Sequence, residues 1–194
     1  MRIERRFPHT LVITPEERTV AAIVYIASDD VAWAISDDGT WIAPLTVAAT
    51  VDADGNPVKD PSSVPEGTQL TSLTGADAAL ELAREAGAVL ITDVASGVAP
   101  VSGQAVDSDV IKAGLAYATG FSADFLKQVK DISVPSVEAI SIHLTSGVEV
   151  SLGAPENIET KERVVTKLLA QEENVTYINV RTPDAYTFRS AQTG

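Results

Sequence analysis

The stretch ISIHLTSGVEVSLG, residues 140–153, carries the clearest structural signal in this chain of 194 residues. Apolar and polar residues alternate on both sides of Ser146-Gly147, and in an extended backbone successive side chains point to opposite faces. The apolar positions are Ile140, Ile142, Leu144, Val148, Val150 and Leu152. The pattern predicts a β-hairpin with two unlike faces. Its polar face shows no obvious catalytic group, so its purpose has to be found elsewhere.

A helix and two more strands are predicted after this hairpin. In ENIETKERVVTKLLAQ, residues 156–171, apolar side chains recur at helical spacing. VTYINV, residues 175–180, and DAYTFR, residues 184–189, have the composition of strands. The order β-β-α-β-β predicts a helix packed on one face of a largely antiparallel sheet.

The N-terminal third is predicted to be extended. RIERR, TLVIT and VAAIVYIA are three short strands, and residues 31–44 form a hairpin that turns at Asp38-Gly39. Trp33 and Trp41 are predicted to be a cross-strand pair buried against the sheet. Residues 50–74 are rich in Pro, Gly, Asp and Ser, which favours a long surface excursion with little regular structure.

The middle of the chain is predicted to contain both helices and a strand. Residues 76–86 form a helix that ends at Gly87, and AVLITDV after it is a strand. Asp107-Ser108-Asp109 offers a choice of N-cap for a helical region that runs to about Lys130, and FSADFLKQVK within it is either part of that helix or a separate helix that starts at Ser122.

The composition excludes several classes of function. A formal net charge of −13 argues against nucleic-acid binding, which depends on clustered Lys and Arg. The chain has no cysteine, so disulfides, thiolate metal sites and cysteine nucleophiles are excluded. No apolar run approaches the length of about 20 residues that a membrane span needs, so the chain as written is expected to be soluble.

No motif predicts a catalytic, cofactor or metal site. Asp52, Asp54 and Asn56 alternate as in a calcium loop, but Pro57 stands where that loop needs glycine, so an ordinary Asp-Gly turn is favoured. The two histidines, His9 and His143, lie in no helpful motif. Neither a dinucleotide fingerprint nor a Walker loop is present.

Two further features are candidate parts of a binding surface. Lys161 lies on the apolar stripe of its helix, where a stem over the core edge with the ammonium in solvent is favoured over a binding role. AYTFRS, residues 185–190, is the last strand of a meander and could form an open sheet edge that pairs with a partner strand. Tyr186 and Phe188 would face one side, and Thr187 and Arg189 the other. A protected or internally paired edge is an equal alternative.

These segments resemble the extracytoplasmic part of the bacterial cell-division family FtsQ/DivIB. The pieces that carry the resemblance cover about half of the chain in the family's order: RRFPHTLVITPEERTVAAIV, WAISDDGTWI, TSLTG, ISIHLTSGVEVSLG, Lys161 in its helix, and YINVRTPDAYTFR. Relative to the family core, the segments near residues 50–65 and 86–107 look like insertions. TSLTG lacks the proline that often precedes this family's Leu-x-Gly.

The resemblance implies an α+β fold: a mainly antiparallel sheet with helices packed on one face, preceded by a truncated POTRA remnant. Residues 1–26 would be the C-terminal strands of the POTRA domain, and residues 27–194 the FtsQ/DivIB-type β domain. The full-length protein would be a type II single-pass protein on the extracytoplasmic side of the cell membrane, with its span outside this chain.

The function that the resemblance implies is a non-enzymatic divisome scaffold without cofactors. It would bind FtsB/DivIC-like and FtsL-like proteins and link them to septal wall synthesis. The partner-binding residues carried over by position are Lys161, Arg181, Tyr186, Thr187, Phe188, Arg189 and Ser190. A charge reversal at Arg189 or a proline at Thr187 should weaken binding and leave the monomer folded.

The alternative function is a secreted hydrolase or carbohydrate-binding domain that uses acids of residues 50–60 together with Asp93. Such an activity needs carboxylates that converge in a cleft. A deep pocket lined by Asp52, Asp54 or Asp93 would favour this alternative, whereas a flat sheet with an open edge at residues 186–190 would favour the scaffold.

Overall fold

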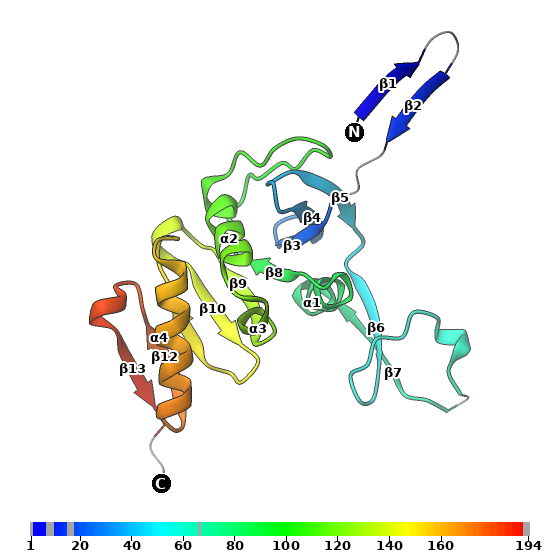
Figure 1. Ribbon diagram of the computed structural model, residues 1–194. Helices are drawn as coiled ribbons and strands as arrows, with labels where there is room; N and C mark the ends of the chain where they lie inside the picture. Colours follow the sequence, from blue (N-terminus) through cyan, green and yellow to red (C-terminus); the bar gives the residue numbers. More distant parts are fainter. Residues whose placement is uncertain (1, 7–9, 15–17, 66, 192–194) are drawn as a thin grey trace.

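The structure is a computed structural model that describes residues 2–6, 10–14, 18–65 and 67–191 (Figure 1). Its centre is one sheet with the strand order β13-β12-β11-β10-β9-β8-β3-β4-β5. The strands are β3 (Val20–Ile26), β4 (Val31–Ser36), β5 (Trp41–Leu45), β8 (Val89–Thr92), β9 (Val129–Ser133), β10 (Ser141–Leu144), β11 (Glu149–Ser151), β12 (Val175–Asn179) and β13 (Thr187–Ser190). Three neighbouring pairs are parallel, β3–β8, β8–β9 and β11–β12, and the others are antiparallel. The prediction of a mainly antiparallel sheet is confirmed.

The hairpin at residues 140–153 forms as predicted. Strands β10 and β11 pair with Ser141 opposite Ser151, and Gly147 supplies the positive φ of +87° that the turn needs. All six of its predicted core positions are buried, with Ile140, Ile142, Val150 and Leu152 fully so. The hairpin therefore has one face in the core and a polar face on the other side.

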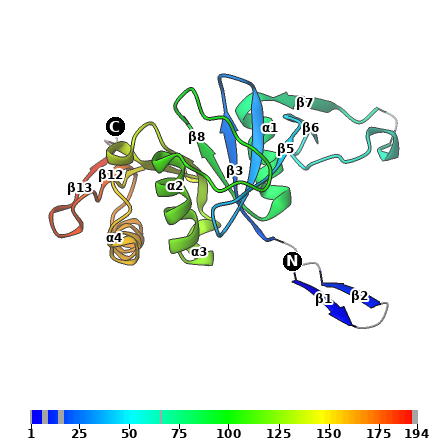
Figure 2. The same ribbon diagram turned by 90° about the horizontal axis from the view of Figure 1, so that it is seen from above.

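Helices cover both faces of the sheet, so the prediction that they pack on one face is wrong for one of them. Helices α2 (Asp109–Gly120), α3 (Ala123–Leu126) and α4 (Ile158–Gln171) lie over the main core. Helix α1 (Gly75–Ala86) packs on the opposite face over β3, β4 and β8 (Figure 2). The reason is visible in β3, where Ile23 and Val24 point to opposite faces and are both buried.

Residues 50–74 are more regular than predicted. Strands β6 (Ala48–Asp52) and β7 (Leu70–Thr74) form a separate antiparallel ribbon, with a short 3₁₀ turn, Pro61–Ser63, between them. The calcium-like motif at its tip is an Asp-Gly turn, because the carboxylate of Asp52 accepts the N–H of Asn56 at 2.8 Å and Gly55 N–H donates to the Asp52 carbonyl at 3.0 Å.

The helical region predicted to reach Lys130 ends earlier. Helix α2 stops at Gly120, and Ser122 starts a separate helix by accepting the N–H of Phe125 at 3.2 Å. Strand β9, which was not predicted, begins at Val129. The segment 86–107, interpreted as an insertion, contains strand β8 in the centre of the sheet, so this part of it belongs to the core of the domain.

The N-terminal strands β1 (Arg2–Arg6) and β2 (Thr10–Thr14) pair with each other and stand apart from the sheet in both views (Figures 1 and 2). Strand β3 pairs with β4 and β8 and is therefore part of the large sheet. The division into residues 1–26 and 27–194 stays a prediction. The POTRA identity of β1 and β2 stays a prediction, and His9 lies outside the described residues.

Candidate partner-binding edge

Strand β13 lies at one edge of the nine-stranded sheet. Among the strands that the structure describes, its one neighbour is β12, with which it pairs antiparallel from Asn179 opposite Thr187 to Val175 opposite Ser190. All four of its residues are exposed. The alternative of an internally paired last strand therefore does not hold within the described part of the chain.

The backbone of β13 presents hydrogen-bonding groups to solvent at alternate residues. Ala191 N–H donates to the Asn174 carbonyl at 2.8 Å, and the Thr176 hydroxyl donates to the Arg189 carbonyl at 3.3 Å. Since backbone groups of successive residues point to opposite sides of a strand, Thr187 and Arg189 face β12. The N–H and C=O groups of Phe188 and Ser190 therefore point away from the sheet.

The two faces of β13 differ in chemistry. Phe188 lies opposite the buried Ile178 on the face covered by α4, yet 38% of Phe188 is exposed. Arg189 lies opposite Tyr177 on the other face, and its guanidinium stacks 4.3 Å from the centre of the tyrosine ring. The predicted separation of Phe188 from Arg189 is confirmed. Tyr177 was missed, although its alternation with Ile178 in VTYINV placed it on the face of Arg189.

Arg181 follows β12 and ties it to neighbouring loops. Its backbone N–H donates to the Asn179 side-chain oxygen at 3.1 Å, and its guanidinium donates to the Glu138 carbonyl. The stem packs on Gly153, where an added Cβ would lie 3.2 Å from the Arg181 Cγ. The side chain is exposed, so Arg181 borders the edge while it makes these internal contacts.

Lys161 is buried, so the prediction that its ammonium reaches solvent is wrong. The side chain is 2% exposed, and Nζ donates to the Tyr117 hydroxyl at 2.9 Å and to the carbonyls of Leu152 and Ala154 at 2.7 and 2.6 Å. Burial lowers the pKa of Lys161, an effect that the nearby Glu156 opposes. Burial also raises the pKa of the Tyr117 hydroxyl, which keeps it a donor.

The buried contacts of Lys161 join several elements of the domain, and its carried-over role in partner binding stays a prediction. Lys161 ties α2 and α4 to the loop at residues 152–154, and Gly153 of that loop supports Arg181. In this structure Lys161 is an internal contact between these elements and not a surface group. Its helical spacing shows that it faces the core, but the three oxygens that accept its hydrogen bonds lie in two other segments, helix α2 and the loop at residues 152–154.

The other edge of the sheet, β5, is covered. Trp41 N–H donates to the Gln104 carbonyl at 2.9 Å, and Gly103 N–H donates to the Trp41 carbonyl at 2.7 Å. Thr40 pairs with Ala105 in an isolated bridge. Pro44 within β5 has no N–H to offer a partner. The loop at residues 103–106 and this proline leave β13 as the open edge of the sheet.

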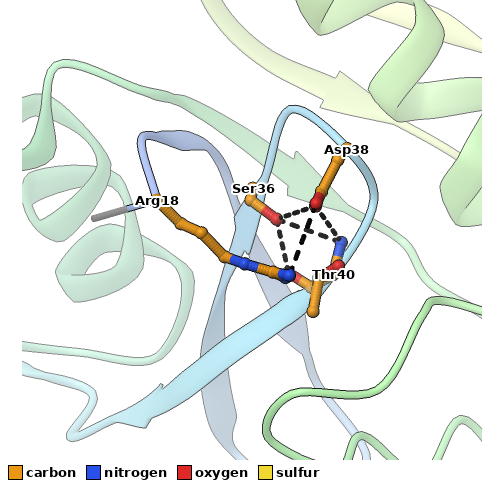
Figure 3. Close-up of polar contacts among 4 residues, drawn as sticks. All are labelled: Arg18, Ser36, Asp38 and Thr40. Atoms are coloured by element: carbon orange, nitrogen blue, oxygen red, sulfur yellow. Dashed lines mark hydrogen bonds and ion pairs between the residues drawn. The ribbon is translucent and has the colours of Figure 1, made fainter. Parts of the chain in front are cut away.

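The turn that starts β5 is held by a compact polar cluster (Figure 3). The buried Ser36 donates its hydroxyl to the Asp38 carboxylate and accepts the N–H of Thr40 at 3.1 Å, while Thr40 N–H also reaches Asp38 at 3.1 Å. Arg18 lies 3.5 Å from Asp38. The hydrogen bonds from Ser36 and Thr40, together with Arg18, lower the pKa of Asp38. Behind this turn, Trp33 and Trp41 form the predicted pair, edge to face at 5.9 Å.

The acids of the hydrolase alternative are not brought together. Asp52 serves the turn of the β6–β7 ribbon, whereas Asp93 follows β8 and accepts the Ser133 hydroxyl at 2.6 Å. A pocket between the ribbon and α1 is lined by Thr50, Lys59, Glu81 and Glu85 among others, without Asp52 or Asp54. His143 pairs with Asp131 at 2.7 Å, but the described residues hold no group of three or more side chains suited to a metal ion.

No helix within the described ranges is both long and apolar enough to cross a membrane. The family model for the cell division protein FtsQ/DivIB, C-terminal, matches residues 39–181. The match includes Lys161 and Arg181 and ends before β13. No curated protein matches the chain.

Proposed function

Because the chain belongs to the FtsQ/DivIB family of cell-division proteins, we propose that it is a divisome scaffold that binds a partner strand along β13. The family is one of non-enzymatic division proteins. The partners proposed for this chain are FtsB/DivIC-like and FtsL-like proteins, which it would link to septal wall synthesis on the extracytoplasmic side of the cell membrane. An N-terminal membrane span of the full-length protein would hold it there.

The observation that carries this proposal is the open edge at β13. Strand addition needs a row of backbone groups without a partner, and the outward N–H and C=O groups of Phe188 and Ser190 supply it. The covered edge at β5 offers no equivalent row. Backbone pairing tolerates side-chain changes in the partner, so the edge can serve even where a relative binds a different sequence.

Of the seven residues carried over from the family, five line this edge: Tyr186, Thr187, Phe188, Arg189 and Ser190. In the proposed complex, Phe188 and Ser190 exchange hydrogen bonds with the partner, whereas Thr187 and Arg189 hold β13 to β12. Arg181 contributes at the border of the edge, and Lys161 supports it from the core.

The test is a titration of this chain with synthetic peptides from the extracytoplasmic segment of the organism's FtsB/DivIC-like protein. The informative variant is Ser190→Pro, which removes an outward N–H from an exposed position. Ser190→Ala is the matched control because it keeps that N–H. A proline at Thr187 is less informative than first expected, since the Thr187 backbone faces Asn179 of β12 and its loss would disturb the sheet itself.

We expect the parent and Ser190→Ala to bind alike, and Ser190→Pro to bind at least about tenfold more weakly because it loses a backbone hydrogen bond and clashes with the added strand. Amide hydrogen exchange of β12 should stay unchanged in all three proteins. Equal binding by Ser190→Pro would show that the partner does not pair with β13, and no binding by the parent would contradict the partner class.

A further inference from the structure

Two rows of side chains cross the face of the sheet that α2–α4 leave uncovered, and both rows end on β13. The strand registers place Asp131, His143, Glu149, Tyr177 and Arg189 in one row. They place Thr92, Ser133, Ser141, Ser151, Asn179 and Thr187 in the other. Helix α1 covers this face only over β3, β4 and β8. A strand added to β13 would therefore extend both rows by one position each.

The first row ends in a cation without a counter-ion. Arg189 is exposed and stacks on Tyr177, and among the described residues no carboxylate oxygen lies within 4.0 Å of its guanidinium. Glu149, the nearest acid along the row, is two strands away, or about 10 Å at ordinary strand spacing. The next position outward is only about 5 Å from Arg189. A side chain of an added strand at that position would lie within reach of the N–H donors of the Arg189 guanidinium.

The opposite face of β13 carries one large apolar side chain, Phe188, beside the small polar Ser190. Phe188 continues the line of the buried Ile178 over the core, and it remains 38% exposed because no strand covers its outer side. Tyr186, just before the strand, is 43% exposed. These two rings are large apolar surfaces at the rim of the domain, and an added strand would cover Phe188 with the side chain directly opposite it.

We propose that the strand bound by β13 alternates between the two chemistries, with carboxylate side chains beside Arg189 and apolar side chains beside Phe188. This inference rests on the proposed function, because it describes the partner of the same edge. The period of two in a strand fixes the alternation, and guanidinium N–H groups pair well with carboxylates. The residue of the bound strand that lies beside Thr187 can carry either a hydroxyl or a carboxylate side chain.

The test fuses candidate strands to the C-terminus of the full chain through a flexible linker of about 15 Gly/Ser residues, which spans about 20 Å and raises the local concentration to the millimolar range. One fusion has about eight residues of alternating Val and Glu, and the other replaces each Glu by Thr. Hydrogen exchange of the Phe188 amide reports docking in every background, and that of the Ser190 amide reports it in the backgrounds that keep Ser190. Each fusion is made in the parent, Arg189→Gln and Ser190→Pro backgrounds.

Two general effects disfavour docking of the Val/Glu strand, so stronger protection by this strand would have to come from a specific contact. The net charge of −13 repels an acidic strand, and Thr has a higher strand propensity than Glu. We nevertheless expect the Val/Glu strand to protect the two amides about threefold to tenfold more than the Val/Thr strand at about 0.15 M salt, and Arg189→Gln to remove this difference.

The outcomes separate the two proposals. Equal protection by both strands, or a Glu preference that survives Arg189→Gln, overturns the inference about the partner's sequence and leaves strand addition intact. Protection by neither strand, or protection unaffected by Ser190→Pro, overturns strand addition at β13 itself. Both proposals are supported if Ser190→Pro removes the protection given by either strand and Arg189→Gln removes only the preference for the Val/Glu strand.

Discussion

The two edges of the nine-stranded sheet are treated in opposite ways. At β5, both backbone groups of Trp41 are paired with the loop at residues 103–106, and Pro44 interrupts the row of donors. At β13, every residue is exposed and the outward groups of Phe188 and Ser190 have no strand beside them among the described residues. An exposed edge is an aggregation hazard, so covering one edge and leaving the other bare is consistent with use of the bare one.

The edges also differ in where their support comes from. The covered edge, β5, is stabilised by hydrogen bonds to the loop at residues 103–106, which lies on its outer side. Behind the open edge, the buried Lys161 and Tyr117 hydrogen-bond to the loop at residues 152–154, against which Arg181 packs. In the proposed complex the open edge has no cover of its own, so we expect the buried contacts behind it to contribute to its stability.

The largest effect is expected from breaking the inner support. Lys161→Met keeps an apolar stem in the core but leaves two carbonyls and a hydroxyl without their charged donor, so the free energy of unfolding should fall by about 3 kcal/mol. Tyr117→Phe removes one hydroxyl from the same network and should cost about 1 kcal/mol. Urea unfolding followed by tryptophan fluorescence measures both. A Lys161→Met protein as stable as the parent would show that the network does not stabilise the fold.

A smaller effect is expected from removing the outer cover. Gly103 has φ +80° and donates its N–H to Trp41, so Gly103→Pro loses both the conformation and the donor and should destabilise the fold by about 2 kcal/mol. Gly103→Ala keeps the donor and has free space for its Cβ, so it should cost about 1 kcal/mol, from strain alone. Light scattering should show concentration-dependent association for the proline variant only. Association of both variants would mean that the cover does not depend on this hydrogen bond.

The smallest effect is expected from the turn that begins the covered edge. Because the pKa of Asp38 is lowered in the folded state, its stabilisation is present above the unfolded pKa and is lost as the pH falls through the folded pKa. The difference in urea midpoint between the parent and Asp38→Asn should therefore shrink below about pH 4 and be constant between about pH 5 and 7. A difference that does not vary with pH would assign the effect to the amide's geometry instead of the charge.

Elements with strong local periodicity were predictable from the sequence. The hairpin at residues 140–153, helix α4 and the tryptophan hairpin depend on side chains that alternate or recur over many residues, and each formed where its pattern placed it. The separation of Phe188 from Arg189 follows from the same period of two. The family could also be identified from such pieces, because they occur in a fixed order.

Features that depend on distant parts of the chain were not predictable. Strand β9 is only five residues long and follows a short helix, so its sequence continues a plausible helical pattern until β8 and β10 pair with it. The apolar stripe of α1 is built largely from alanines, which do not reveal which face of the sheet it covers. Lys161 was expected in solvent because a helix pattern cannot show that Leu152, Ala154 and Tyr117 converge on its ammonium.

The unequal edges set the valency of any assembly that grows by strand pairing. A sheet with two bare edges can be extended at both and propagate into a fibre, whereas this sheet terminates after one addition because β5 is already occupied by residues 103–106. Two copies that paired through β13 would form a closed two-fold dimer and would compete with the partner strand for the same backbone groups. The cover on the far edge thus limits the stoichiometry of complexes formed on the near one.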